Sequence, residues 1–219
     1  MTFTAGSNRV LRGAAAAALA TAAAIISPLA LPAANAAGSN AIGVVSAGGP
    51  DEPPGIGRAG QAFVDSLRGK VGNRSLGVYA VNYPASYDFL AAANGANDAS
   101  AHIQYVMNTC PDTRLVLGGY SQGAAIVDVI TSVPFPAIGF NNPLPPDAPD
   151  HIAALAVFGN PTAEVGLPLA SSPVYGFKAI DLCNGGDPVC SDGNSVPAHR
   201  SYGADGGANQ AAAFVANLL

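Results

Sequence analysis

Short apolar runs recur along the chain, and glycine, proline or asparagine follows soon after each of them. Runs bounded in this way, with β-branched side chains among them, are typical of strands that are buried on both faces. The pattern predicts five such strands. They are residues 41–45, 76–81, 115–117, 152–158 and 174–182.

Between these runs, apolar side chains fall three or four residues apart, which is the spacing of an amphipathic helix. Helices are therefore predicted at residues 60–67, 121–130 and 209–218, with a fourth that ends near residue 108. Asp98 or Ser100 is suited to cap the start of this fourth helix, and His102 on it is expected to be a surface residue. The alternation of strands and helices predicts a single α/β domain with a parallel sheet covered on both faces.

Residues 134–149 contain six prolines and are predicted to lack regular structure. Two interpretations remain open for this segment. It is either a plain surface connection or a loop at the mouth of a substrate site, because it also carries the apolar side chains Phe135, Ile138, Phe140 and Leu144.

The first residues of the chain do not fit the core pattern. Arg9 and Arg12 precede a long apolar run, and Ala34-Asn35-Ala36 is a small-x-small cleavage site, so residues 1–36 are predicted to be a secretory signal peptide and residues 37–219 the mature domain. The alternative is a retained membrane anchor. Cleavage removes two arginines and no acidic residue, which changes the formal net charge from −5 to −7. An acidic, secreted or cell-wall-associated protein is a poor candidate for nucleic-acid binding.

Export places the three cysteines in an oxidising compartment, where pairing is expected. Cys183 and Cys190 are the natural pair, and their bridge would fix the shape of residues 182–191. Cys110 is then left over. We expect it to be a buried, inert side chain, with an intermolecular bridge or a reactive thiol as the alternatives.

The chemistry centres on Gly119-Tyr120-Ser121-Gln122-Gly123, where an apolar run ends in Gly-x-Ser-x-Gly and passes into a predicted helix. This setting is that of a nucleophile elbow, in which the serine sits on a sharp strand-to-helix turn and flanking glycines let the backbone crowd together. Ser121 is therefore the predicted nucleophile. The backbone N–H of Gln122, at the helix start, is placed to donate to an oxyanion.

A serine hydroxyl needs a histidine to take its proton and a carboxylate to orient that histidine. Of the three histidines, His102 precedes the elbow and His151 introduces a predicted strand, whereas His199 lies in a loop after the last strand. The chain order serine, acid, histidine is that of the α/β-hydrolase architecture. His199 is therefore the predicted general base.

The acid should lie between Ser121 and His199, in a loop beyond the carboxyl end of a strand. Asp187 fits best, because Cys183 and Cys190 enclose it, and Asp181 and Asp192 are the competitors. We expect neither a metal nor a cofactor.

These residues together resemble the cutinase family. The family serine lies in Gly-Tyr-Ser-Gln-Gly, and the family acid lies in a Cys-x6-Cys loop that contains Asp-Pro-x-Cys, as residues 183–190 do here. Residues 78–85 and 98–103 resemble its secreted actinobacterial branch. The resemblance covers nearly the whole mature chain.

The resemblance implies a lidless α/β-hydrolase, a three-layer sandwich with a central five-stranded parallel sheet, that acts on esters of lipids, polyesters or short acyl chains. It implies Ser121 as nucleophile, His199 as general base and then acid, and Asp187 as the residue that orients His199. Loops at residues 83–90 and 189–196 would line the acyl cleft. We expect a monomer that has peripheral contact with lipid or the cell envelope.

Two departures from the family pattern bear on activity. The family has a cysteine before its first strand, paired with the one that matches Cys110, and residues 38–41 contain none. The family also has serine or threonine after that strand, where it forms half of the oxyanion hole, and here Pro50 supplies neither an N–H nor a hydroxyl. The N–H of Gly49 is the expected substitute if the loop shifts to bring it into this place, and the alternative is an incomplete oxyanion hole.

Three functions therefore compete. The leading one is a secreted serine esterase, and the second is an acyltransferase that uses the same three residues. The third is a catalytically impaired homologue that acts as a secreted binding or cell-envelope protein, and Pro50 motivates it.

Overall fold

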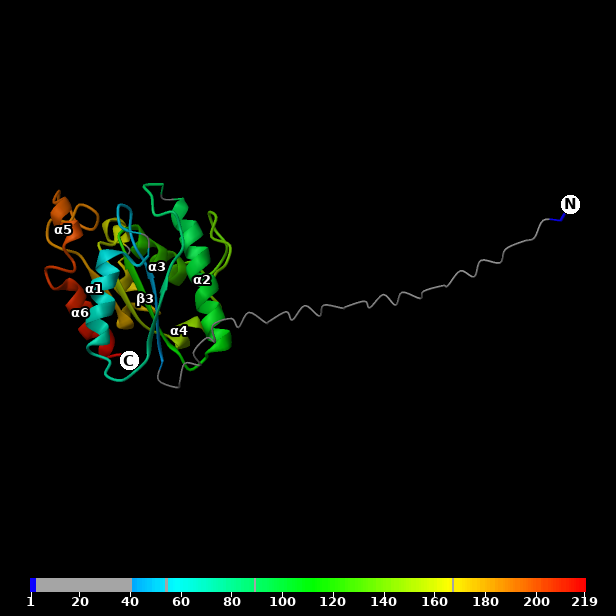
Figure 1. Ribbon diagram of the computed structural model, residues 1–219. Coiled ribbons are helices and arrows are strands. Elements are labelled where there is room, and N and C mark those ends of the chain that lie inside the picture. The colour runs from blue at the N-terminus through cyan, green and yellow to red at the C-terminus, as the bar shows by residue number, and fades with distance from the viewer. Residues whose placement is uncertain (3–40, 54, 89, 167) are drawn as a thin grey trace. The chain divides into compact units, whose positions relative to one another are not determined.

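The computed structural model describes residues 1–2, 41–53, 55–88, 90–166 and 168–219. Within that part of the chain, five strands form one parallel sheet in the order β2-β1-β3-β4-β5 (Figure 1). The strands are β1 Ile42–Ala47, β2 Leu76–Ala80, β3 Arg114–Tyr120, β4 Ile152–Phe158 and β5 Ala179–Leu182. The predicted parallel sheet is confirmed. The signal peptide predicted at residues 1–36 lies, from residue 3 onward, outside the described residues.

Helices cover both faces of the sheet, as predicted. One face carries α1 Gly57–Arg68 and α6 Gly207–Ala216, and the other carries α2 Ala91–Thr109 and α3 Gln122–Ser132 (Figure 1). Leu115 and Leu117 of β3 point into the core beneath α2 and α3, whereas Val116 between them points into the core beneath α1 and α6. This alternation is the two-residue period of a strand, and it gives the molecule three layers.

Strand β2 is less buried than predicted. Its residues are exposed or half-buried, because β2 forms the edge of the sheet and pairs with β1 on one side. Strand β5 is shorter than predicted, because the short 3₁₀ helix η3 Gly176–Lys178 immediately precedes it. Two further 3₁₀ helices, η1 Pro161–Val165 and η2 Leu169–Ser171, follow β4.

Helix α2 begins eight residues before the earliest predicted start, because its N-cap is Leu90 and not Asp98. Asp98 does not cap it, since its carboxylate accepts hydrogen bonds from Tyr79 Oη and from the N–H of Asn82. The added turns pack on α3 through small side chains, and a Cβ at Gly95 would overlap Ile126. Close helix packing therefore outweighs the weak helix propensity of glycine and asparagine in this segment.

The proline-rich segment has no helix or strand from residue 134 to 147, apart from one isolated bridge, as predicted. The prediction was wrong at the end of the segment, where residues Ala148–His151 form the short helix α4. Pro149 is tolerated in the first turn of α4, because an N–H there would have no helical acceptor and proline lacks an N–H. Phe140 is buried in the core with α2 and α3, so this segment is anchored as a connection on that face.

The fold places the loops that follow the strands at one edge of the sheet. The loop after β1 and the short helix α5 Val196–Arg200 lie at the same end of the molecule in Figure 1. Ser121 follows β3 directly at this edge, next to the switch point where β1 has β2 on one side and β3 on the other. Ligands of open α/β sheets bind at such a position. Among the described residues, no helix is long and apolar enough to cross a bilayer.

Candidate active site

Ser121 lies on the strained turn that the sequence predicts. Its φ is +55° and its ψ is −120°, a conformation that non-glycine residues rarely adopt, and α3 begins at the next residue. The N–H of Ser121 donates to Phe158 O at 2.9 Å, which ties the turn to β4. A Cβ at Gly119 would overlap the backbone of Gly123, and one at Gly123 would overlap Ala47 O. Both glycines are therefore required by close backbone approach.

His199 and Asp187 are joined by a hydrogen bond of 2.8 Å between Nδ1 and Oδ2. His199 lies on α5, and its ring stacks against Tyr120 with 4.8 Å between ring centroids. The imidazole also needs the space above Gly159, where a Cβ would lie 2.7 Å from His199 Cε1. Ser121 and His199 line one cleft. The structure thus brings together the three residues that the sequence selected.

The competing residues lie elsewhere. Asp181 accepts hydrogen bonds of 2.9 Å from Asn160 Nδ2 and from the N–H of Leu169, and Asp192 is exposed. His102 is half-buried rather than fully exposed, and its ring stacks on Tyr79 with 3.6 Å between centroids. Burial lowers the pKa of His102.

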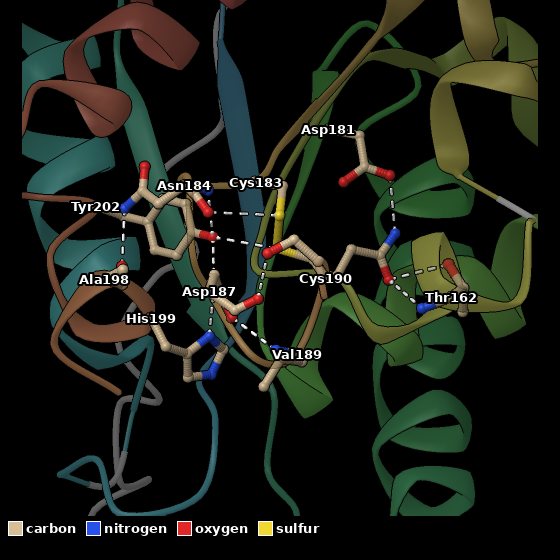
Figure 2. Close-up of a disulfide and its surroundings, with 12 residues drawn as sticks. Thr162, Asp181, Cys183, Asn184, Asp187, Val189, Cys190, Ala198, His199 and Tyr202 are labelled. Atoms are coloured by element: carbon tan, nitrogen blue, oxygen red, sulfur yellow. Dashed lines mark hydrogen bonds and ion pairs between the residues drawn. A yellow bond between two sulfur atoms is a disulfide. The ribbon is translucent and has the colours of Figure 1, made fainter. Parts of the chain in front are cut away.

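Asp187 is fully buried, and its carboxylate is held by donors on several sides (Figure 2). The N–H of Val189 donates to Oδ1 at 2.8 Å, and Tyr202 Oη donates to Oδ2 at 2.6 Å. Burial and the hydrogen bond to Asp187 raise the pKa of Tyr202, so the phenol keeps its proton and remains a donor. Tyr202 escaped the sequence analysis, because a tyrosine three residues after a histidine carries no recognisable signal.

The predicted disulfide between Cys183 and Cys190 is present and closes the loop that carries Asp187 (Figure 2). Asn184 fastens this loop to α5, since its Nδ2 donates to Ala198 O at 2.8 Å. Cys110 is free, as expected, but it is half-buried rather than buried. Among the described residues, no group of three His, Cys, Asp or Glu side chains is arranged to hold a metal ion.

The N–H of Gly49, predicted as the second oxyanion donor, faces a protein acceptor in this structure. The N–H of Gly49 donates to Glu52 Oε2 at 3.2 Å, so it is already engaged. Glu52 is held in place because it also accepts a hydrogen bond of 2.8 Å from the N–H of Arg58, and a side chain at Gly57 would overlap its carboxylate. Sequence reasoning missed Glu52 as the residue that organises this loop.

Gln122 lies at the start of α3, as the sequence predicts. Its N–H lies in the first turn of α3, where no helical carbonyl accepts it. Its buried side chain bonds the loop after β2, with Oε1 accepting from the N–H of Ser86 at 3.2 Å and Nε2 donating to Asp88 O at 3.1 Å. Gln122 therefore joins the elbow to one wall of the cleft.

The cleft beside Ser121 has a volume of about 170 Å³. It is lined by Tyr87 from the loop after β2 and by Val189 and Val196 from the segment before His199. The resemblance to the cutinase family implies these two loops, 83–90 and 189–196. Residues 134–149 do not line the cleft, so the described structure favours the surface connection for the proline-rich segment.

A parallel sheet between two helical layers, with a serine at a strand-to-helix elbow, defines the α/β-hydrolase class. The family model described as Cutinase matches residues 38–219. The chain therefore belongs to the cutinase family.

Individual relatives agree with this assignment. The chain is 56% identical over 216 residues to phospholipase Culp4 of Mycobacterium tuberculosis, a match that covers 98% of this chain and 94% of the relative. It is 48% identical over 186 residues to carboxylesterase Culp1 of Mycobacterium tuberculosis, with 81% of each chain covered.

Solved structures agree as well. The structure of a Trichoderma reesei cutinase in complex with a phosphonate inhibitor matches with a TM-score of 0.64 and 34% identity, over 81% of this chain and 75% of the other. The catalytic core domain of an acetyl xylan esterase from Trichoderma reesei matches with a TM-score of 0.68 and 29% identity, over 83% and 100% of the chains.

Proposed function

We propose that this protein is a serine esterase that hydrolyses carboxylic ester bonds of lipids or of short to medium acyl esters. The observation that carries the proposal is one juxtaposition. Ser121 stands on a strained elbow in the same cleft as His199, whose Nδ1 is bonded to the buried carboxylate of Asp187. This is the set of groups that activates a serine hydroxyl at neutral pH.

In the proposed reaction, Ser121 Oγ attacks the ester carbonyl carbon and His199 Nε2 takes the hydroxyl proton. Asp187 holds Nδ1–H and stabilises the imidazolium. The N–H of Gln122 donates to the oxyanion of the tetrahedral intermediate. When this intermediate collapses, His199 returns the proton to the departing alcohol and an acyl-Ser121 ester remains. Water then attacks that ester with His199 as base. As the bond between the acyl carbon and Oγ breaks, His199 returns the proton to Ser121 Oγ, and the carboxylic acid leaves.

The substrate class is proposed from the relatives and from the cleft. The named relatives include a phospholipase, a carboxylesterase, a cutinase and an acetyl xylan esterase, and an ester of an acyl group is common to all their substrates. The exposed apolar side chains of Tyr87, which lines the cleft, and of Leu90, three residues later, support peripheral contact with lipid.

The chain is further proposed to be exported as a monomer after removal of residues 1–36. The Cys183–Cys190 disulfide supports export, because such bridges persist in oxidising compartments. Intact mass of the protein recovered from culture medium tests both the cleavage site and the bridge. A mass that includes residues 1–36 would contradict the signal peptide.

Two other functions remain as candidates. An acyltransferase would use the same acyl-enzyme and pass the acyl group to an alcohol, and product analysis with an added alcohol separates it from hydrolysis. A catalytically impaired binding protein is favoured by one observation, which is that Pro50 has no N–H and the N–H of Gly49 is engaged by Glu52.

Labelling with a fluorophosphonate probe tests the proposal. We expect the wild-type protein to be labelled on Ser121 and to hydrolyse nitrophenyl esters, and Ser121→Ala to lose both properties while it unfolds at the same denaturant concentration. Labelling without turnover would favour the impaired homologue. Hydrolysis by Ser121→Ala at near wild-type rate would overturn the assignment of the nucleophile.

A further inference from the structure

Three segments that are distant in the sequence meet at the carboxylate of Asp51, beside the cleft that contains Ser121. Tyr87 Oη, from the loop after β2, donates to Asp51 Oδ2 at 2.6 Å. Arg200, at the end of α5, reaches the same oxygen with Nη2 at 3.5 Å. All three residues line the cleft. The hydrogen bond between Tyr87 and Asp51 therefore links the loop after β1 to the loop after β2, and both loops line the cleft.

The backbone of Asp51 is held in an unusual conformation. Its φ is +60°, in the left-handed region that glycine adopts most easily and that aspartate tolerates better than most residues. It directly follows Pro50, whose own φ is fixed by its ring. An aspartate at this point presents a carboxylate to Tyr87, which a glycine there could not do.

Tyr87 is held through its neighbours in the chain as well as through its phenol. Its neighbours Ser86 and Asp88 are bonded to the buried side chain of Gln122, next to the nucleophile. Tyr87 is nevertheless 74% exposed. The hydrogen bond to Asp51 raises the pKa of Tyr87, so the phenol remains a neutral donor at neutral pH. The hydrogen bonds of Ser86 and Asp88 to Gln122 hold the backbone on either side of Tyr87, and the hydrogen bond to Asp51 holds its phenol at the mouth of the cleft.

The size of the cleft determines which acyl chains the contact between Tyr87 and Asp51 affects. Its volume of about 170 Å³ is well below the range of roughly 300–1,000 Å³ that is usual for small-molecule sites. The reacting ester and a short acyl chain fit such a space. A longer chain needs more room at the mouth.

We propose that Tyr87 and Asp51 form a clasp across the mouth of the cleft that selects short acyl chains, with Arg200 positioning Asp51. This inference rests on the proposed esterase function and names its substrate preference. Because both partners are exposed, opening the clasp changes binding of a long chain by about fivefold at most. The clasp therefore disfavours long acyl chains but does not exclude them.

The test compares nitrophenyl butyrate with nitrophenyl octanoate in five proteins. They are wild type, Tyr87→Phe, Asp51→Gly, the double variant of these two, and Tyr105→Phe. Tyr87→Phe keeps the ring and removes the donor, and Asp51→Gly removes the acceptor while suiting the positive φ. Tyr105 is an exposed tyrosine on α2 that does not line the cleft, so its variant is the matched control.

We expect the ratio of kcat/KM for octanoate to that for butyrate to rise by up to about fivefold in Tyr87→Phe and in Asp51→Gly, mainly through a lower KM for octanoate. The double variant should show the same ratio as either single variant, because both break one contact. Tyr105→Phe should match wild type. An unchanged ratio in both cleft variants, in a protein that hydrolyses butyrate, overturns the clasp and leaves the esterase function standing.

If wild type reacts without turnover, the rates of labelling by short-chain and long-chain alkyl phosphonates provide the same ratio. If neither phosphonate labels Ser121, the esterase function fails, and the proposed selectivity fails with it.

Discussion

Tyr202 donates a hydrogen bond to Asp187 from inside the core, with 2.6 Å between its phenol oxygen and Oδ2. The same carboxylate oxygen faces His199 Nδ1 at 2.8 Å. Tyr202 is 1% exposed and packs against Phe158, with 5.6 Å between ring centroids. The aromatic core that contains Tyr202 thus holds the carboxylate that is hydrogen-bonded to His199.

Replacing Tyr202 by phenylalanine should lower kcat by roughly tenfold with little change in KM, because a less well held carboxylate orients His199 poorly in the transition state. Loss of the hydrogen bond should also lower the free energy of unfolding by about 1–2 kcal/mol. Ester hydrolysis and urea unfolding measure the two effects. Tyr175→Phe, at a buried tyrosine in the other core, is the control and should keep its kcat. Full activity in Tyr202→Phe would show that Asp187 needs no support from the core.

Replacing Pro50 by threonine should raise kcat on a short-chain nitrophenyl ester by at least about tenfold, because it restores a donor to the oxyanion. KM should change little, since the added donor acts on the transition state. The engagement of the Gly49 N–H by Glu52 strengthens this expectation. Stopped-flow or steady-state assays measure the change, with circular dichroism as the check on folding. An unchanged kcat in a folded variant would mean that another group already completes the oxyanion hole.

Reduction of the Cys183–Cys190 bridge should lower activity before it unfolds the domain, because the bridge shapes the loop that presents Asp187. Closure of so short a loop contributes about 2.5 kcal/mol in the chain-entropy model, which is a fraction of a typical domain's stability. Activity and far-UV circular dichroism are followed together during titration with a reductant. Peptide mapping of the oxidised protein serves as control. A bridge that includes Cys110, or simultaneous loss of activity and structure, would refute this prediction.

Asp128 makes stability depend on pH. Burial raises the pKa of Asp128 to about 6, an increase that hydrogen bonds from Thr162 and Asn160 partly offset and the charge of Asp181 reinforces. Because the pKa is higher in the folded than in the unfolded chain, the folded state binds the proton more tightly. The resulting stabilisation is fully present below about pH 4 and is lost as the pH rises through about 6.

Asp128→Asn removes this ionisation and keeps an acceptor for Thr162. Relative to wild type, the variant should gain up to about 3 kcal/mol in its free energy of unfolding between about pH 4 and pH 7.5. Urea unfolding at several pH values measures the gain. Asp65→Asn, at an exposed aspartate, should show a much smaller change. A constant difference between Asp128→Asn and wild type across this range would contradict the prediction.

The sequence by itself determined the parts of this protein whose physical causes are local. The strained turn at Ser121 follows from Gly119 and Gly123, because only glycine allows such close backbone approach on both sides. The short spacing of Cys183 and Cys190 was enough to predict their bridge. The alternation of apolar strands and amphipathic helices was enough to predict the parallel sheet and its two covering layers.

Only the tertiary structure decided the features that depend on contacts between distant segments. The edge position of β2 follows from the pairing order of the strands, which no single strand's composition encodes. Three hydrogen bonds join polar groups across a loop or between elements. They are those from the Gly49 N–H to Glu52, from Tyr202 to Asp187 and from Tyr87 to Asp51. Such partners are ordinary residues in the sequence, because their roles arise from the distance and burial that folding imposes on them.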